Sequence, residues 1–386
     1  MRSIYFDSAA TTQLRPEVAE RMFEVLRDTP GNPSSTHAFG RTAKSLIESA
    51  RKSIAAHLNV SAGEIIFTSG GTEADNLAIT CAVRDLGVGR IITSRVEHHA
   101  VLHAAEFAAS SYGATLEFVR LKECGTPDEV HLAELLSKSD VKTLVSLMHV
   151  NNEVGNMIDL KEIAILCKEH KALFHSDMVQ SIGHFDSDFQ EIPIDFAAAA
   201  AHKFHGPKGI GFAFVRKNSG LKPLIYGGGQ ERGLRAGTES VHNIVGMEMA
   251  LKLAYDNLIE EREYVEGLKN YFADRLEQEI PLMKLNGNCR FNTKSTYTLL
   301  NVCLPVTPEK ALMLLFQLDM KGIACSKGSA CQSGGDKGSH VLSAILSEED
   351  IVKPSLRFSF SKYNTKEEID FVIEVLKEFI ETPSIV

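Results

Sequence analysis

The sequence predicts an α/β protein with a large domain built on a mainly parallel, doubly wound sheet, and a smaller α+β domain. Two observations predict this fold. Short apolar runs alternate with helical patterns from residue 41 to about residue 250, and the pattern changes beyond about residue 255. Strands that alternate with helices are typical of a parallel sheet whose crossover connections are helical.

Seven apolar runs in the first region are expected to be strands. They are residues 64–67, 91–93, 115–119, 143–150, 172–175, 194–199 and 210–215. Between them, apolar residues at helical spacing predict helices. These helices begin at about residue 41, at residue 73 and at residue 160.

The last third of the chain has a different pattern, which predicts the smaller domain. Apolar residues at helical spacing run from Leu258 to Leu276. Thr365 and Glu368 form a capping box that opens the last helix. We therefore expect a large domain over residues 15–255, and a small domain formed by residues 1–14 together with 256–386.

Composition and charge exclude several classes of protein. The 386 residues are 44% hydrophobic and 24% charged, with a formal net charge of −9 and no basic run, so we expect no direct binding to nucleic acid or membrane. The seven cysteines are dispersed and form no zinc-ligand pattern, which predicts a reducing compartment and no metal site. The chain starts without a signal-peptide pattern, so the expected location is the cytoplasm.

Polar clusters stand at the ends of several predicted strands. They are Ser69-Gly70-Gly71-Thr72, Glu97-His98-His99, Asn151-Asn152-Glu153, Asp177 to Gln180, and His202-Lys203. One such cluster would be an ordinary loop. Because ligands of open α/β sheets bind beyond the carboxyl ends of the strands, five clusters predict one shared site.

Lys203 is the most informative of these residues. It follows Asp195, Phe196 and five alanines, a stretch apolar enough to be buried. Burial disfavours the charged form of lysine and makes the amine nucleophilic, although a lysine at a strand end can also extend to solvent. Asp177 taken alone is better explained as a helix cap than as a catalytic group, and a glycine-rich turn such as that at Gly71 more often reflects simple turn geometry than a phosphate site.

Residues 323–338 are rich in glycine, serine and lysine and contain two cysteines. Around Cys331 the segment contains no residue that would bury the side chain, which predicts an exposed thiol, and nearby Lys327 and Lys337 would favour its thiolate form. Cys325 follows Ile323 and Ala324 and is expected to pack at the base of this loop. A loop cysteine taken alone is more often incidental than catalytic.

Ordered motifs along almost the whole chain resemble those of the cysteine desulfurases, enzymes of the class V aminotransferase group that bind pyridoxal 5′-phosphate (PLP) and have PLP fold type I. The matching segments are 5–12, 31–37, 67–74, 97–101, 148–155, 202–209 and 227–233. The context Gly328-Ser329-Ala330-Cys331 resembles the housekeeping and nitrogen-fixation (NifS/IscS-like) branch. The resemblance implies conversion of L-cysteine to L-alanine by a homodimer.

The resemblance also implies the roles of single residues. Lys203 would bind PLP as a Schiff base, His98 would stack on the ring and move protons, and Cys331 would accept the sulfur as a persulfide. The implied cofactor-binding residues are Lys203, Asp177 (on the ring nitrogen), Gln180, His202, Gly71, Thr72, Asn152, His98 and, reaching into the other subunit, Thr238. The implied residues for the substrate carboxylate are Arg357, Asn32 and Asn152.

Position 200 departs from the family pattern. The family usually has a serine there that contacts the phosphate, and this chain has Ala200. The missing hydrogen bond is worth about 1.5–3 kcal/mol before compensation. Water or another donor can replace the serine hydroxyl, so this position bears on how tightly the cofactor is held and not on the chemistry.

The resemblance also bears on the sulfur acceptor and on the alternative activities. The resemblance implies iron–sulfur scaffold proteins or sulfur carriers of tRNA thiolation as acceptors. A selenocysteine lyase or another class V PLP aminotransferase is the nearest alternative. A non-catalytic sulfur-transfer scaffold is an alternative from another class, and the presence of Lys203, Asp177, His98 and Cys331 together argues against it.

Overall fold

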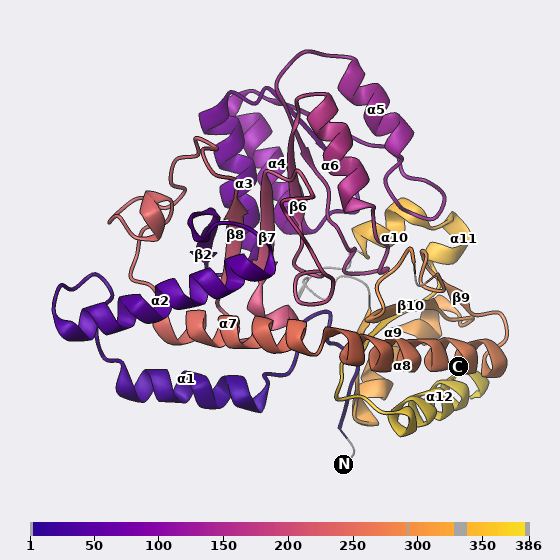
Figure 1. The fold of residues 1–386 in the computed structure, drawn as a ribbon. Helices are drawn as coiled ribbons and strands as arrows, with labels where there is room; N and C mark the ends of the chain where they lie inside the picture. The colour runs from indigo at the N-terminus through magenta and orange to yellow at the C-terminus, as the bar shows by residue number, and fades with distance from the viewer. Residues whose placement is uncertain (1–2, 292, 328–337, 383–386) are drawn as a thin grey trace.

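The computed structural model describes residues 3–291, 293–327 and 338–382. A seven-stranded sheet with the order β2-β8-β7-β6-β5-β3-β4 forms its centre (Figure 1). The strands are β2 (Ile65–Thr68), β3 (Arg90–Thr93), β4 (Thr115–Phe118), β5 (Thr143–Ser146), β6 (Leu173–Asp177), β7 (Phe196–Ala200) and β8 (Gly211–Val215). All pairs are parallel except the two that β8 makes with β2 and β7, which confirms the predicted fold class.

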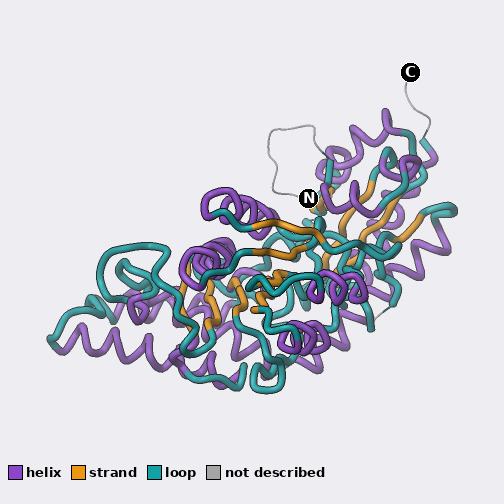
Figure 2. The backbone as a smooth tube through the Cα atoms, turned by 90° about the horizontal axis from the view of Figure 1, so that it is seen from above, coloured by secondary structure: helices purple, strands orange, loops and turns teal. Residues whose placement is uncertain are grey.

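Helices cover both faces of this sheet (Figure 2). One face carries α3 (Gly71–Leu86) and α4 (His99–Tyr112). The other carries α1 (Pro16–Asp28), α2 (Ala38–His57), α5 (Glu129–Ser137), α6 (Leu160–Glu169) and α7 (Val241–Asp256). Short 3-10 helices are η1 (Ala62–Glu64), η2 (Ala201–Lys203) and η3 (Glu231–Gly233).

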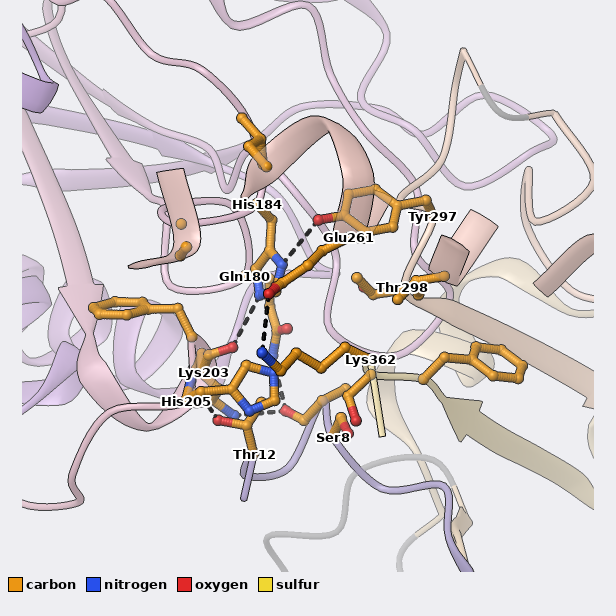
Figure 3. A pocket seen from close by; sticks show the side chains of 18 of the residues that line it. Ser8, Thr12, Gln180, His184, Lys203, His205, Glu261, Tyr297, Thr298 and Lys362 are labelled. Carbon is orange, nitrogen blue, oxygen red and sulfur yellow. Dashed lines mark hydrogen bonds and ion pairs between the residues drawn. The ribbon is translucent and has the colours of Figure 1, made fainter. Parts of the chain in front are cut away.

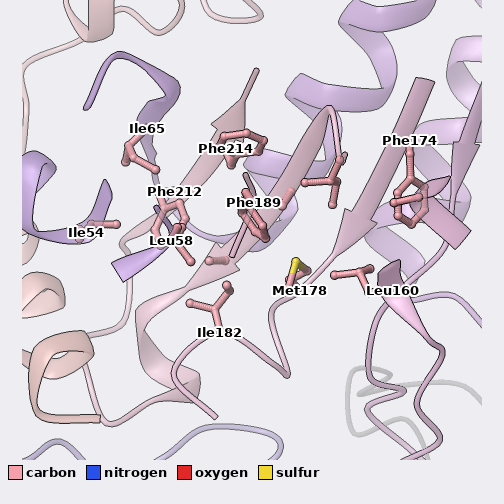
Figure 4. Packing of buried hydrophobic residues seen from close by; sticks show 14 of the residues in the cluster. Ile54, Leu58, Ile65, Leu160, Phe174, Met178, Ile182, Phe189, Phe212 and Phe214 are labelled. Carbon is pink, nitrogen blue, oxygen red and sulfur yellow. The ribbon is translucent and has the colours of Figure 1, made fainter. Parts of the chain in front are cut away.

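The seven-stranded sheet has a hydrophobic core on each of its two faces, and alternating strand residues contribute to one core or the other. Ile65 and Phe67 pack on the side of α2 and α7, whereas Ile66 packs against α3 and α4. Successive strand residues point to opposite faces, so strands covered on both sides have apolar residues at every position. Figure 4 shows the first of these cores, where Phe212 and Phe214 lie close to Phe189.

The chain after residue 257 forms a second group of elements around its own core. They are α8 (Leu258–Glu279), β9 (Lys284–Leu285), β10 (Leu299–Cys303), α9 (Pro308–Met320), β11 (Ile323–Ala324), β12 (Ser326–Lys327), α10 (His340–Ile345), α11 (Glu348–Ile351), β13 (Ser355–Ser359) and α12 (Lys366–Glu381). An antiparallel sheet has the order β12-β13-β10-β9, and β1 (Ile4–Tyr5) pairs with β11. The predicted capping box of the last helix is confirmed, while the domain boundaries stay a prediction.

The strand predicted at 143–150 is shorter than expected, because β5 ends at Ser146. Beyond it, the N–H groups of Leu147 and His149 still bond to carbonyls of β6, at 3.1 and 3.0 Å. The pairing of β5 with β3 stops where β3 ends, at Thr93, so the chain has a strand on one side only. In the described part of the chain, we find no helix with the length and apolar character needed to cross a membrane.

Candidate active site

A cavity of about 320 Å³ lies at the carboxyl ends of the parallel strands. Nine of the predicted site residues line it: Gly71, Thr72, His98, Asn152, Asp177, Gln180, His202, Lys203 and Arg357. They come from the start of α3, from the segments that follow β3, β5, β6 and β7, and from β13. The sheet therefore brings together residues that are far apart in the sequence.

Lys203 ends η2, directly after the buried strand β7. Its Nζ atom donates hydrogen bonds to the carbonyl oxygens of Ala9 and Ala10, at 2.6 and 2.9 Å. Gln180 Nε2 donates to the same Ala9 oxygen at 2.9 Å. The N-terminal segment thus holds the lysine side chain inside the cavity.

Lys203 also lines a second, much smaller cavity (Figure 3). Its volume is about 30 Å³. His184 closes it by bonding to the backbone oxygen of Lys203 at 2.9 Å and to the Tyr297 hydroxyl at 3.2 Å. Such a volume holds about one water molecule, so the larger cavity is the one that can accept an organic ligand.

Asp177 is the last residue of β6 and is 6% exposed. Its Oδ1 accepts the N–H of Val179 at 2.9 Å, and no helix starts there, so the alternative role of a helix cap is wrong. Burial raises the pKa of Asp177, while His98, the Val179 N–H and Lys203 lower it. A cation in the cavity would favour the carboxylate further.

His98 stands at the N-terminus of α4, with its Nδ1 accepting the N–H of Ala100 at 3.1 Å. Burial lowers the pKa of His98, and the charge of Lys203 lowers it as well. The ring is therefore neutral at neutral pH. Because Nδ1 accepts, the proton lies on Nε2.

The turn at Gly71 opens α3 at one end of the cavity. A Cβ atom at Gly71 would lie 2.5 Å from Val179 Cγ2, so only glycine allows the two segments to approach this closely. Backbone N–H groups and the dipole of a helix N-terminus favour an anion. His202 lines the same cavity, and burial lowers its pKa to about 4, which makes it a neutral donor.

Arg357 lies on β13 and is 2% exposed. One terminal nitrogen donates to the backbone oxygen of Asn152 at 2.8 Å, and the other donates to Oδ1 of Asp7 at 2.9 Å. The Nε atom of Arg357 is buried and has no hydrogen-bond partner in the described chain. This free edge can bind a carboxylate.

Two predicted residues do not line this cavity. Asn32 and Thr238 are both exposed. Cys331 lies outside the described residues. Cys325 packs against the core of the C-terminal elements as predicted, and burial raises its pKa to about 12.

The structure also places residues in the cavity that were not predicted there, among them Asp75 and His340. His340 lies two residues after the predicted cysteine loop, and Asp75 lies in the second turn of α3. Asp75 stands four residues after Gly71 and therefore lies on the same face of the helix. This spacing could have predicted Asp75 as a residue of the site.

The donors of the cavity fit PLP. Asn152 Oδ1 and His202 Nδ1 are buried and make no hydrogen bond within the described chain, so both await a ligand. The helix N-terminus at Gly71 suits the phosphate, and the carboxylate of Asp177 suits a protonated ring nitrogen. Lys203 supplies the amine.

The fold and this cavity define a class of protein, the PLP-dependent enzymes of fold type I. Residues 4–372 match the model of the family Aminotransferase class-V. The chain is 40% identical over 382 residues to cysteine desulfurase IscS of Dictyoglomus turgidum, which covers 98% of this chain and 95% of that protein. A solved structure described as a NifS-like protein has a TM-score of 0.87 and 34% identity, over 98% of this chain and 99% of the other. The chain belongs to the aminotransferase class-V family and, within it, to the PLP-dependent cysteine desulfurases.

Proposed function

We propose that this chain converts L-cysteine to L-alanine and passes the sulfur, as a persulfide on Cys331, to acceptors of iron–sulfur cluster assembly or tRNA thiolation. The observation that carries the proposal is the presence of Lys203, Asp177 and Arg357 in one cavity. A relative solved as "SspA in complex with cysteine" supports the substrate. It is 32% identical, with a TM-score of 0.80, over 94% of this chain and 100% of that one.

The cofactor would be held at both of its ends. Gly71, Thr72 and His202 would bind the phosphate, Asp177 the ring nitrogen and Lys203 the reactive carbon. Gln180 and Asn152 would form hydrogen bonds with the ring oxygen or with nearby substrate atoms. When bound, PLP supplies an electron sink next to the α-carbon of the amino acid.

Lys203 and His98 would handle protons in this site. With PLP bound, the Lys203 amine would be the base that takes a proton from the substrate and returns it. His98 would stack on the ring and hold its own proton at Nε2, as the hydrogen bond at Nδ1 dictates. Burial lowers the pKa of His98, so its neutral ring is present at neutral pH and can exchange protons there.

Arg357 would orient the substrate through its carboxylate. The Asp7 and Asn152 contacts hold the guanidinium in place, and its Nε, which has no partner in the described chain, would be left to bind a ligand. Arginine can bind a carboxylate with two parallel hydrogen bonds, which a lysine cannot reproduce. This orientation would leave the substrate sulfur free to meet the thiol of Cys331.

The described residues on either side of Cys331 are attached to the cavity. Before it, Ser326 donates to Asp7 at 2.8 Å, the same carboxylate that holds Arg357. After it, Ser339 bonds to the buried carboxylate of Glu153, and His340 donates to the Glu97 carbonyl at 2.8 Å. These anchors support sulfur transfer from the cavity to Cys331.

The transfer itself balances without an added oxidant or reductant. The Cys331 thiolate attacks the substrate sulfur, an S–S bond forms and the C–S bond breaks. The electron pair of the C–S bond stays with the β-carbon of the substrate. Addition of a proton to this carbon then gives the methyl group of alanine. Thiol and cysteine thus give persulfide and alanine.

We also propose a homodimer in which Thr238 reaches the phosphate of the second copy. The segment that carries Thr238 is held by Glu231, whose carboxylate makes a buried ion pair with Arg51 at 2.7 Å. Within the same segment, the Gln230 amide contacts Ser34, two residues after Asn32. Asn32 and Thr238 therefore belong to one exposed region, and both would face the partner's cavity.

Alanine formation from cysteine tests the proposed activity. The purified holoenzyme should be yellow and should form alanine and sulfide in equal amounts with a thiol reductant, faster when a sulfur-accepting scaffold or carrier protein is present. Comparing cysteine with selenocysteine decides between desulfurase and selenocysteine lyase. A colourless protein that forms no alanine when PLP is supplied would instead support the non-catalytic scaffold.

Ala200 offers a gain-of-affinity test. It is 2% exposed, lines the cavity and lies beside Gly71 at the phosphate end. The Ala200→Ser variant should bind PLP more tightly, by about tenfold, because it restores a hydrogen bond to a charged group. Equilibrium dialysis of PLP measures this, with Ala199→Ser, on the opposite face of β7, as the control. Equal affinity of Ala200→Ser and the parent would show that another donor already replaces the hydroxyl.

A further inference from the structure

A buried carboxyl–imidazole pair lies beside the proposed cofactor site and has no part in the chemistry above. Asp75 Oδ1 is 3.4 Å from Nε2 of His175, and these side chains are 1% and 0% exposed. Neither atom has a hydrogen-bond partner in the described chain, so the two buried atoms face each other without a bond that satisfies either of them. On the other side of the ring, Nδ1 of His175 is 2.8 Å from Oγ of Ser146.

The fold places this pair next to Asp177. Asp75 and Asp177 line the same cavity. His175 and Asp177 are alternate residues of β6, so their side chains point to the same face of the sheet. Ser146 stands opposite His175 on β5 and completes the row. The chain Asp75–His175–Ser146 therefore forms the wall behind the carboxylate proposed for the ring nitrogen.

Three buried carboxyl groups influence one another in this region, those of Asp75, Asp177 and Glu97, and they differ in protonation. Burial raises the pKa of Asp75 well above its usual range, and the charges of Asp177 and Glu97 raise it further. Burial also raises the pKa of Glu97, and it lowers the pKa of His175 to about 3. Buried carboxylates this close to one another do not all ionise. The proton of the pair thus lies on Asp75, and His175 is neutral.

Burial raises the pKa of Asp177 as well, but the Val179 N–H and the charge of Lys203 oppose this rise, whereas each cause that acts on Asp75 raises its pKa. The hydrogen bonds follow from these charges. A proton on Asp75 would face Nε2 of His175, 3.4 Å away, and the remaining proton of that ring, on Nδ1, would face the Ser146 hydroxyl. An ionised Asp75 would add a like charge beside Asp177 and favour protonation of that residue.

We propose that Asp75 is a neutral carboxylic acid that donates to His175, and that this pair is a positioning element which keeps a second negative charge away from Asp177. Asp177 is then free to carry the charge opposite the cofactor ring nitrogen. The inference rests on the proposed role of Asp177, and it adds the reason why a second buried acid in the same cavity does not compete with it.

The test uses holoenzyme loaded with PLP that is ¹⁵N-labelled at the ring nitrogen. The ¹⁵N chemical shift reports whether this nitrogen is protonated, and equilibrium dialysis gives the PLP dissociation constant. Asp75→Asn keeps the shape and a neutral N–H donor for His175, so the ring nitrogen should stay protonated and the constant should change by less than about threefold. Asp75→Ala leaves Nε2 of His175 buried without a donor, so the constant should rise about tenfold or more.

Each result has a definite meaning. If Asp75→Asn loses affinity or ring protonation as Asp177→Asn does, Asp75 acts as an anion and the inference is wrong. An Asp75→Ala variant with wild-type affinity would also overturn it, since no positioning would then be needed. Because Asp75→Asn is isosteric, its spectrum decides the matter even if the alanine variant does not fold. An unprotonated ring nitrogen in the parent enzyme would instead reject the role of Asp177, and this inference with it.

Discussion

Replacing Cys331 by alanine is expected to abolish alanine formation from cysteine while the protein remains yellow. The cavity that would hold PLP is built from other residues, so the cofactor should bind as before. Without the thiol, no group takes up the substrate sulfur, and turnover should fall by about a thousandfold or more. Steady-state alanine formation and the visible absorbance spectrum measure the two effects separately.

The matched control is Cys325→Ala. Cys325 lies six residues earlier, and burial raises its pKa to about 12, so at neutral pH it is a thiol and a poor nucleophile. This variant should keep its activity. Persulfide detected by mass spectrometry on Cys325 rather than on Cys331, or alanine formation at the normal rate in Cys331→Ala, would contradict the proposed sulfur transfer.

Replacing Lys203 by alanine is expected to remove the covalent link to PLP together with the activity. Of the lysines in the described chain, Lys203 is the one that lines the cavity. Its loss removes both the amine that binds the cofactor and the base that moves the substrate proton. Turnover should fall by about a thousandfold or more, and the visible band of the bound cofactor should disappear, as measured by absorbance after gel filtration.

Lys208→Ala is the control for this variant, because Lys208 stands five residues later and is exposed. It should keep the band and the activity. Reduction with borohydride followed by peptide mapping gives an independent reading, since it fixes PLP to the lysine that holds it. Label found on any lysine other than Lys203 in the parent protein would refute the assignment.

Much of the site could be predicted because its residues follow strands. Lys203 comes directly after β7 and Asp177 ends β6, and both strands are apolar runs that are plain in the sequence. Parallel strands end at one edge of a sheet, so the polar residues that follow them must meet. The strand predicted at 143–150 was too long, because its pairing with β3 ends at Thr93. The apolar pattern of a strand carries no information about where the neighbouring strand ends.

Linear order thus specified the alternation of strands and helices, the lysine, its carboxylate partner and the glycine turn, since each depends on short-range pattern. Packing specified the rest. Asp75 became part of the site only because α3 lies against β6 and β7, and its proton is retained because burial removes water from three carboxyl groups at once. The separation of Asn32 and Thr238 from their own cavity likewise follows from where the loops fold, which is a matter of long-range contacts rather than of local sequence.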